Sequence, residues 1–182
     1  MEYNDSRLNT IVGKIGGDTG ALMFLKDSTS VSEFFPDFIV QIDRLVKPTY
    51  PDWIKELVHP ELELLGPAEY DLQAGVRQWL HDDQNRGYVR GGVIYKYLKD
   101  TNTLGSCLSL QDGLVIQQKG VEIFRELFKG KKVFLWKSVV QLHHDNYLLV
   151  PFLREEGGEL VVHWRWLDDR WNLNDPALRF SK

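Results

Sequence analysis

The chain has 182 residues, of which 43% are hydrophobic and 26% charged, and its net charge is −4. This composition disfavours a disordered chain, and the length suits a single domain over residues 1–182 with a sizeable core. The only cysteine, Cys107, excludes an intramolecular disulfide and a thiolate-cluster metal site, and no apolar run approaches the roughly 20 residues of a membrane span. Because no export signal is visible either, we expect a cytoplasmic protein without a membrane partner.

The charges are distributed unevenly along the chain. Residues 1–85 carry 7 Lys and Arg against 15 Asp and Glu, residues 86–142 carry 10 against 4, and residues 143–182 carry 5 against 7. The basic middle indicates either an electrostatic surface for an acidic partner or a segment that the acidic N-terminal part neutralises across the fold. The second interpretation is the ordinary one, because segregation along a chain says little about segregation in space.

The first 28 residues predict a helical hairpin, which would be an appendage to the domain. Apolar residues at helical spacing precede Gly16 and Gly17, which are a natural stop, and Asp18 can cap a second short helix. Further along, the alternation of apolar residues over 38–42 favours a strand, with a helix as the competing interpretation.

The middle of the chain predicts helices separated by loops. Pro51 opens a predicted helix that ends before Pro60, and residues 60–71 form a surface loop or boundary rich in Pro, Gly and Glu. The apolar residues of 72–80 suit another helix, although Gly75 weakens it. The sequence GGVIYKYLKD, residues 91–100, predicts a short helix with a basic C-terminal end.

Helical spacing is clearest over residues 107–128, where members of an inward-facing stripe recur every three or four positions. Ser109 and Asp112 resemble a capping box, with Asp in place of the usual Glu, and Gly130 is a C-terminal stop. Glycines within the stripe favour a pair of amphipathic helices, broken near Gly120, over a coiled coil.

From residue 132 onward the apolar period changes to two. The turn signals HHDN and EEGG separate three runs that predict an antiparallel meander over 132–182, namely KVFLWKSVVQL, YLLVPFLR and ELVVHWRWL, and ALRF predicts a short fourth strand. Pro151 lacks a donor for the sheet, so we expect a bulge or a sheet edge there. The predicted fold class is α+β, with a helical N-terminal two thirds packed on a C-terminal antiparallel sheet of three to four strands.

The stretch GELVVHWRWLDDRW, residues 158–171, is the best candidate for a binding face. Side chains alternate along a strand, so Trp164 and Trp166 share a wholly apolar face and are predicted to belong to the core. The other face and the turn-like end of the stretch hold polar and aromatic residues, although Trp171 could instead be a lid on the core. Exposed Trp and Arg often anchor interfaces, and the predicted partner contacts are His163, Arg165, Arg170 and Trp171.

The basic segment 86–142 supports a second hypothesis, a nucleic-acid-binding accessory protein. Helices followed by strands would suit a winged-helix arrangement in which lysines neutralise phosphates. The sequence pI of about 5.7 weighs against a dedicated DNA-binding domain. The predicted nucleic-acid contacts are Lys129, Lys131, Lys132 and Lys137.

Catalytic and cofactor motifs are missing from the sequence. His143, His144 and Asp145 are the nearest approach to a reactive cluster, but adjacent histidines on an extended chain point to opposite faces, and a polar hairpin turn explains them better. A site would need a further imidazole, such as that of His163. No Walker A loop, Rossmann fingerprint or EF-hand loop occurs. We therefore expect no catalytic residue, metal or cofactor, and a histidine-based enzyme is only a third hypothesis.

Three runs, IVGKIGG, VFLWKSVVQ and WRWLDDRWNLNDPALRF, resemble sequences of an uncharacterised bacterial protein family. The resemblance touches both ends of the chain and implies a bacterial protein, but it transfers no activity and no site residue. The first hypothesis is therefore a non-enzymatic interaction or regulatory protein with an unknown protein partner.

Overall fold

The computed structural model describes residues 38–143 and 147–181. The helical hairpin predicted over residues 1–28 lies outside the described residues. The elements in chain order are β1 (Ile39–Gln41), β2 (Ile54–Leu57), β3 (Glu69–Asp71), β4 (Val76–Trp79), α3 (Asp82–Asn85), β5 (Val89–Arg90), α4 (Gly91–Asp100), the 3₁₀ helix η2 (Leu104–Ser106), α5 (Leu110–Lys119), α6 (Val121–Phe128), β6 (Val133–Phe134), the 3₁₀ helix η3 (Trp136–Ser138), β7 (Val140–Leu142), β8 (Leu148–Glu156), β9 (Glu159–Trp166), β10 (Arg170–Trp171) and β11 (Ala177–Phe180).

The predicted helical N-terminal two thirds and the predicted antiparallel sheet of three to four strands are both wrong, because the largest sheet has seven strands, with β11 parallel to β6. The described part of the chain is mostly sheet. It contains eleven strands and only four short helices, α3 to α6. The predicted helix after Pro51 contains β2, and the predicted helix over 72–80 contains β4. A short apolar run fits the spacing of a helix as well as that of a strand. The strands that pair with these two segments are distant in sequence, since β2 pairs with β7 and β4 pairs with β11, and this pairing makes both segments strands.

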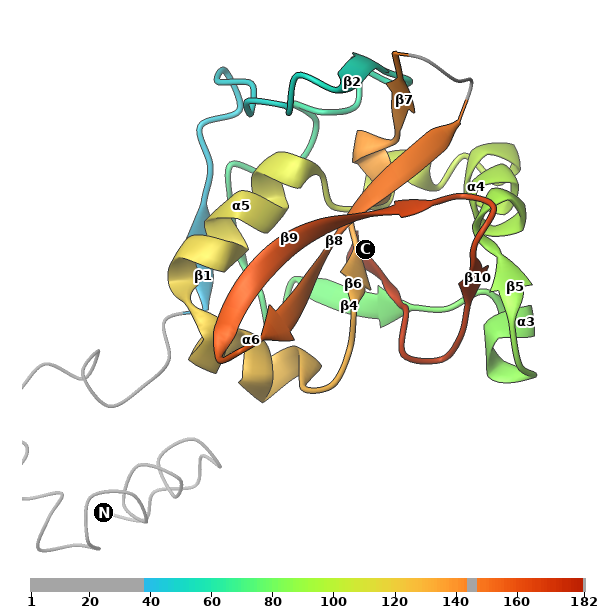
Figure 1. The fold of residues 1–182 in the computed structure, drawn as a ribbon. Helices are drawn as coiled ribbons and strands as arrows, with labels where there is room; N and C mark the ends of the chain where they lie inside the picture. The colour runs from blue at the N-terminus through green and yellow to red at the C-terminus, as the bar shows by residue number, and fades with distance from the viewer. Residues whose placement is uncertain (1–37, 144–146, 182) are drawn as a thin grey trace, which may run out of the picture. The chain divides into compact units, whose positions relative to one another are not determined.

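The largest sheet forks at β8. This sheet has seven strands in the order β2-β7-β8-β6-β11-β4, with β9 on the other edge of β8. Along one edge, β9 pairs with nearly the whole of β8. Along the opposite edge, β7 pairs with Leu148 and Leu149, whereas β6 pairs with Phe152 and Leu153. Two arms therefore leave the same edge of β8: β7 with β2 at the top of Figure 1, and β6, β11 and β4 lower in the view.

Pro151 lies at the fork. It faces Trp164 of β9 in a continuous register, so the bulge or edge position expected for it is wrong. The carbonyl oxygen of Pro151 accepts a hydrogen bond from the backbone nitrogen of Leu135 at 3.0 Å, which places the proline nitrogen on the same edge. There η3 interrupts what was predicted as one strand, KVFLWKSVVQL. The missing N–H of Pro151 therefore faces the gap between β6 and β7, where no strand needs its hydrogen bond.

Several local predictions are confirmed. The runs ELVVHWRWL and ALRF contain β9 and β11, the run YLLVPFLR forms most of β8, which continues to Glu156, and residues 91–100 form α4. Ser109 and Asp112 make the predicted capping box at the start of α5. This helix ends at Gly120, whose φ of 95° suits glycine, and α6 follows at once.

Two main core clusters cover the two faces of the β8–β9 hairpin. One face packs against α5, to the left of the hairpin in Figure 1, and α6, below its turn, through Leu153, Leu160, Ile116, Phe124 and Phe128. The other face packs around Phe134, Trp136 and Trp171. A β-carbon at Gly91 would lie 2.3 Å from the ring of Trp171, so α4 begins with a residue that has no side chain.

Candidate functional site

Two predicted contact residues lie in the interior of the protein. The side chain of Trp171 is 0% exposed and packs on the rings of Phe134 and Trp136, with centroid distances of 5.3 and 5.9 Å. Lys137 is also 0% exposed, and its Nζ donates a hydrogen bond to the carbonyl oxygen of Leu65 at 2.5 Å. Neither side chain is available to a partner at the surface of this fold.

His163 and Arg165 are half-buried and engaged within the chain. The ring of His163 stacks on Phe152, and its Nε2 lies 2.8 Å from a carboxylate oxygen of Glu156. The guanidinium of Arg165 lies over Trp171, and Nη1 is 3.2 Å from Oδ1 of Asp175. The contacts of His163 tie β9 to β8, and those of Arg165 tie β9 to β10 and to the loop that follows it. Arg170 is exposed on β10, and its side chain has no hydrogen bond or ion pair to another described residue.

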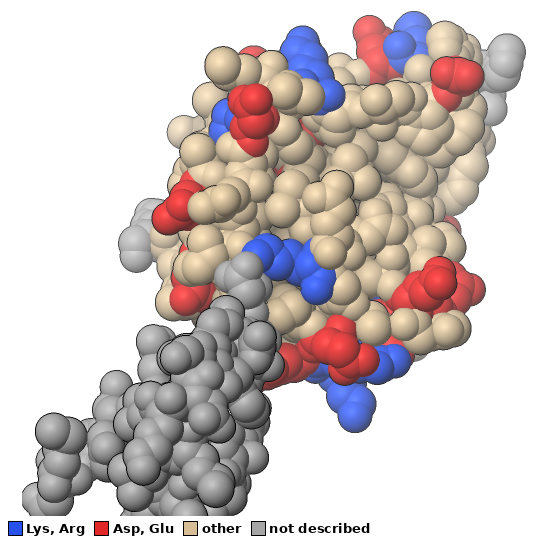
Figure 2. Space-filling model, turned by 90° about the vertical axis from the view of Figure 1, so that its left-hand side faces the viewer, with Lys and Arg blue, Asp and Glu red and all other residues tan. Residues whose placement is uncertain are grey.

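The predicted nucleic-acid lysines do not form one group. Lys129 is exposed, Lys132 is half-buried, and Nζ of Lys131 donates at 3.1 Å to the carbonyl oxygen of Leu173. On the described surface visible in Figure 2, Lys and Arg side chains are separated by acidic and uncharged residues, and no continuous basic patch forms there. The segregation of charge along the sequence therefore does not persist on this face.

The histidines of the described residues have separate partners. His59 lies between the hydroxyl of Tyr95, 2.6 Å from its Nε2, and the carboxylate of Glu61, 3.3 Å from its Nδ1. His81 caps α3. His144 lies outside the described residues. Over 38–143 and 147–181, no group of three His, Cys, Asp or Glu side chains is placed to hold a metal ion.

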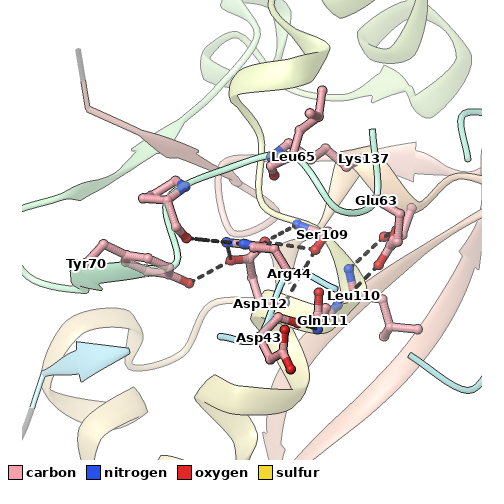
Figure 3. Close-up of polar contacts among 12 residues, drawn as sticks. Asp43, Arg44, Glu63, Leu65, Tyr70, Ser109, Leu110, Gln111, Asp112 and Lys137 are labelled. Carbon is pink, nitrogen blue, oxygen red and sulfur yellow. Dashed lines mark hydrogen bonds and ion pairs between the residues drawn. The ribbon is translucent and has the colours of Figure 1, made fainter. Parts of the chain in front are cut away.

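A buried polar network, which we call the fork cluster, occupies the space beside η3 at the start of α5 (Figure 3). Its centre is Asp112, which is 0% exposed. The carboxylate accepts hydrogen bonds from Arg44, at 2.7 and 3.2 Å, from the hydroxyl of Tyr70 at 3.0 Å, and from the backbone nitrogen and hydroxyl of Ser109, both at 2.8 Å. Both carboxylate oxygens are therefore satisfied. The fork cluster consists of Arg44, Glu63, Tyr70, Ser109, Asp112, Lys137 and Ser138.

Glu63 is the second buried carboxylate of the fork cluster. Its side chain accepts a hydrogen bond from the hydroxyl of Ser138 and one from the backbone nitrogen of Gln111 at 3.3 Å. Burial raises the pKa of Glu63, and the hydrogen bond from Ser138 partly offsets this. The same cause lowers the pKa of Lys137, because burial disfavours its charged form.

The fork cluster joins distant segments and is closed to solvent. It ties residues 43–70 to α5 and η3, and the side chains of Glu63, Asp112, Lys137 and Ser138 are all buried. Burial also raises the pKa of the Cys107 thiol to about 12, so this cysteine is a poor nucleophile. These contacts serve the fold. Only the Ser109–Asp112 cap could be predicted from a sequence motif, since Arg44, Glu63 and Tyr70 belong to no local motif.

An exposed row of aromatic side chains, which we call the aromatic strip, lies at the C-terminal end of β9. It consists of Trp53, Tyr147, Trp164 and Trp166. Trp53 meets Trp164 edge to face at 5.4 Å, Trp166 meets Tyr147 in the same way at 5.0 Å, and the two tryptophans of β9 share one face of the strand. The exposed fractions are 44% for Trp53, 48% for Tyr147 and 40% for Trp166.

The prediction that Trp164 and Trp166 both belong to the core is wrong for Trp166. Their face of β9 is covered by α5 and α6 where it carries Leu160 and Val162. At Trp164 the cover consists of Tyr50 and Trp53, and beyond it the ring of Trp166 contacts only Tyr147 among the aromatic side chains of the described residues. One apolar face thus changes from core to surface along its length.

The outer edge of β9 is open beside the aromatic strip. The backbone nitrogen of Leu167 donates to the carbonyl oxygen of Leu148, so the even-numbered backbone groups of β9 face away from β8. The carbonyl oxygen of Leu160 accepts from the side chain of Gln117, and that of Trp166 from the backbone nitrogen of Asp169. Between them, the backbone groups of Val162 and Trp164 have no hydrogen-bond partner among the described residues.

No helix in the described part of the chain is both long and apolar enough to cross a membrane. No family model, curated protein or solved structure matches the chain. Its function must therefore be inferred from the geometry of the described residues.

Proposed function

We propose that this chain is a non-enzymatic interaction protein that binds an extended segment of a protein partner at the end of β9. The observation that carries the proposal is the position of the aromatic strip next to an open strand edge. A soluble domain usually covers both features, because unpaired strand edges and exposed apolar patches promote association.

The two features suit the two requirements of peptide recognition by strand addition. The backbone groups of Val162 and Trp164, which no described residue pairs, can pair with the backbone of an added strand, and this gives binding without regard to sequence. Alternate side chains of that strand would then meet Trp164 and Trp166, which give selectivity for apolar residues. Tryptophan and tyrosine are favoured anchors of interfaces, since they bury a large area and lose little side-chain entropy.

Two of the contact residues predicted from the sequence, His163 and Arg165, fit this proposal because they hold β9 in place. Arg165 holds the strand to the loop after it through Asp175 and the carbonyl oxygen of Arg170. His163 and Glu156 do the same at the other end of the hairpin. A rigid β9 loses little conformational freedom when a partner binds, and this favours affinity.

A peptide-display selection on the full chain tests the proposal. We expect selected peptides to be extended, with apolar residues at alternate positions, and to bind Trp166→Ala and Tyr147→Ala about tenfold more weakly, because each lost ring removes an anchor. The matched control is Tyr97→Ala, since Tyr97 is an aromatic residue of α4 with 43% exposure, and this variant should bind as the parent does. Equal binding by all three variants would show that the aromatic strip is not the site.

A further inference from the structure

The two-stranded ribbon of β5 and β10 presents two arginines side by side. In its antiparallel register Arg170 faces Arg90, and Trp171 faces Val89. Val89 and Trp171 are buried against the core, so Arg90 and Arg170 point to the opposite, outer face of the ribbon, and both are exposed. Directly opposed residues in a sheet are close enough for their side chains to interact.

This arrangement is electrostatically unfavourable by itself. Like charges directly opposite each other destabilise a strand pair. Neither guanidinium has a hydrogen-bond or ion-pair partner among the described residues, and of the neighbouring carboxylates, Asp169 lies 3.5 Å from Nε of Arg165 while Asp168 is exposed. An anion between Arg90 and Arg170 would replace the repulsion by two charge-assisted contacts.

An exposed aromatic residue adjoins the arginine pair. Tyr88 immediately precedes β5, and alternation along the chain puts it on the same side as Arg90. Its side chain is 66% exposed. The ribbon leads into α4, whose first turn has no acidic side chain, but the amides of Gly91 and Gly92 already donate to the carbonyl oxygens of Asp169 and Leu167. The site is therefore made by side chains and not by the helix terminus.

We propose that the outer face of this ribbon binds a nucleotide unit, with its phosphate between Arg90 and Arg170 and its base against Tyr88. Arginine binds phosphate oxygens through paired N–H groups, and an aromatic ring beside a basic groove is the usual platform for an unpaired base. The site is separate from the aromatic strip and does not depend on the peptide-binding proposal. It also shifts the nucleic-acid hypothesis from the predicted lysines to the first residues of the basic segment 86–142.

Titration of the full chain with three probes tests the site: a nucleoside monophosphate, a labelled single-stranded oligonucleotide, and inorganic phosphate. We expect Arg90→Ala and Arg170→Ala each to weaken nucleotide binding by about tenfold, because each removes a charge-assisted contact. Each should also lower the slope of log K against log salt for the oligonucleotide by about one. Tyr88→Ala should weaken binding of the monophosphate and the oligonucleotide but not of inorganic phosphate.

The matched control is Lys129→Ala, which removes one exposed positive charge elsewhere and should change binding by less than about twofold. All the altered side chains are exposed, and thermal melts would verify that each variant folds. Tighter binding of the oligonucleotide than of the monophosphate would identify a strand as the source of the phosphate, and the reverse would identify a free nucleotide. Absence of binding to the parent chain, or equal losses in Lys129→Ala and Arg90→Ala, would overturn the proposal.

Discussion

The fork cluster and the aromatic strip reverse the usual placement of residue types. In the fork cluster, charged side chains such as Glu63 and Lys137 have exposed fractions of 1% and 0%. In the aromatic strip, the rings of Trp53 and Trp166 have exposed fractions of 44% and 40%. The charged groups can be buried because segments far apart in sequence supply their hydrogen bonds. The rings remain exposed because α5 and α6 cover this face of β9 only where it carries Leu160 and Val162. The difference suggests that the first region specifies the fold, while the second is free to bind.

Removing the carboxylate of Asp112 should have the largest effect, because it disrupts the fork cluster. We expect Asp112→Ala to lower the free energy of unfolding by about 3 kcal/mol, because it leaves the guanidinium of Arg44, which is 11% exposed, without its carboxylate and removes half of the capping box of α5. Urea denaturation measures the change. The matched control is Asp100→Ala at the exposed end of α4, whose ion pair with Lys96 is solvated and should contribute little. A small loss for Asp112→Ala would mean that the cluster is incidental to the fold.

The pH dependence of stability tests the burial of Glu63 in the fork cluster, and its effect should be smaller than that of Asp112→Ala. Because burial raises the folded-state pKa of Glu63, the folded protein holds this proton more tightly than the unfolded chain. The stabilisation is fully present below the unfolded value of about 4.3 and is lost as the pH rises through the folded-state pKa. We therefore expect the stability of the parent chain, relative to Glu63→Gln, to fall as the pH is raised from about 4 towards neutral.

Urea denaturation of both proteins across this pH range measures the difference. Glutamine retains an acceptor for the hydroxyl of Ser138 but does not titrate. The difference between the two proteins therefore reports the protonation of Glu63. The control is Glu56→Gln, which removes a carboxylate whose side chain is 55% exposed. A stability difference that stays constant or rises with pH would contradict a raised pKa for Glu63.

The smallest effect on stability is expected on the exposed side. Trp166→Ala should lower the free energy of unfolding by about 1 kcal/mol or less, because the side chain is 40% exposed and its ring contact is with the exposed Tyr147. Urea denaturation checks this, with Leu173→Ala as a second exposed apolar substitution. A loss comparable to that of Asp112→Ala would place Trp166 in the core and remove the strip as a free surface.

Sequence patterns correctly predicted features that depend on residues close together in the chain. The capping box of α5 depends on Ser109 and Asp112, three positions apart, and it was confirmed together with the alternation of β8 and β9. The helical interpretation of β4 failed because its backbone partners lie in β11, which no local pattern reveals.

The candidate sites were hidden for a related reason. Alternation correctly grouped Trp164 with Trp166, but the extent of cover along that face depends on where α5 and α6 end. Lys137 was one of the predicted nucleic-acid contacts, yet η3 breaks the expected strand at that point and the side chain is buried. Arg90 and Arg170 meet only because the short ribbon joins them.

The position of β11 between β4 and β6 has a consequence for biosynthesis. Trp79 of β4 pairs with Ala177, and Ala177 also pairs with Phe134 of β6, so one late strand closes two edges. Contacts between residues so distant in sequence form slowly, and unpaired edges invite association with other chains. On the ribosome, a nascent chain that has emerged only as far as β9 would carry both edges unprotected, and it would depend on chaperones or rapid release until β11 arrives.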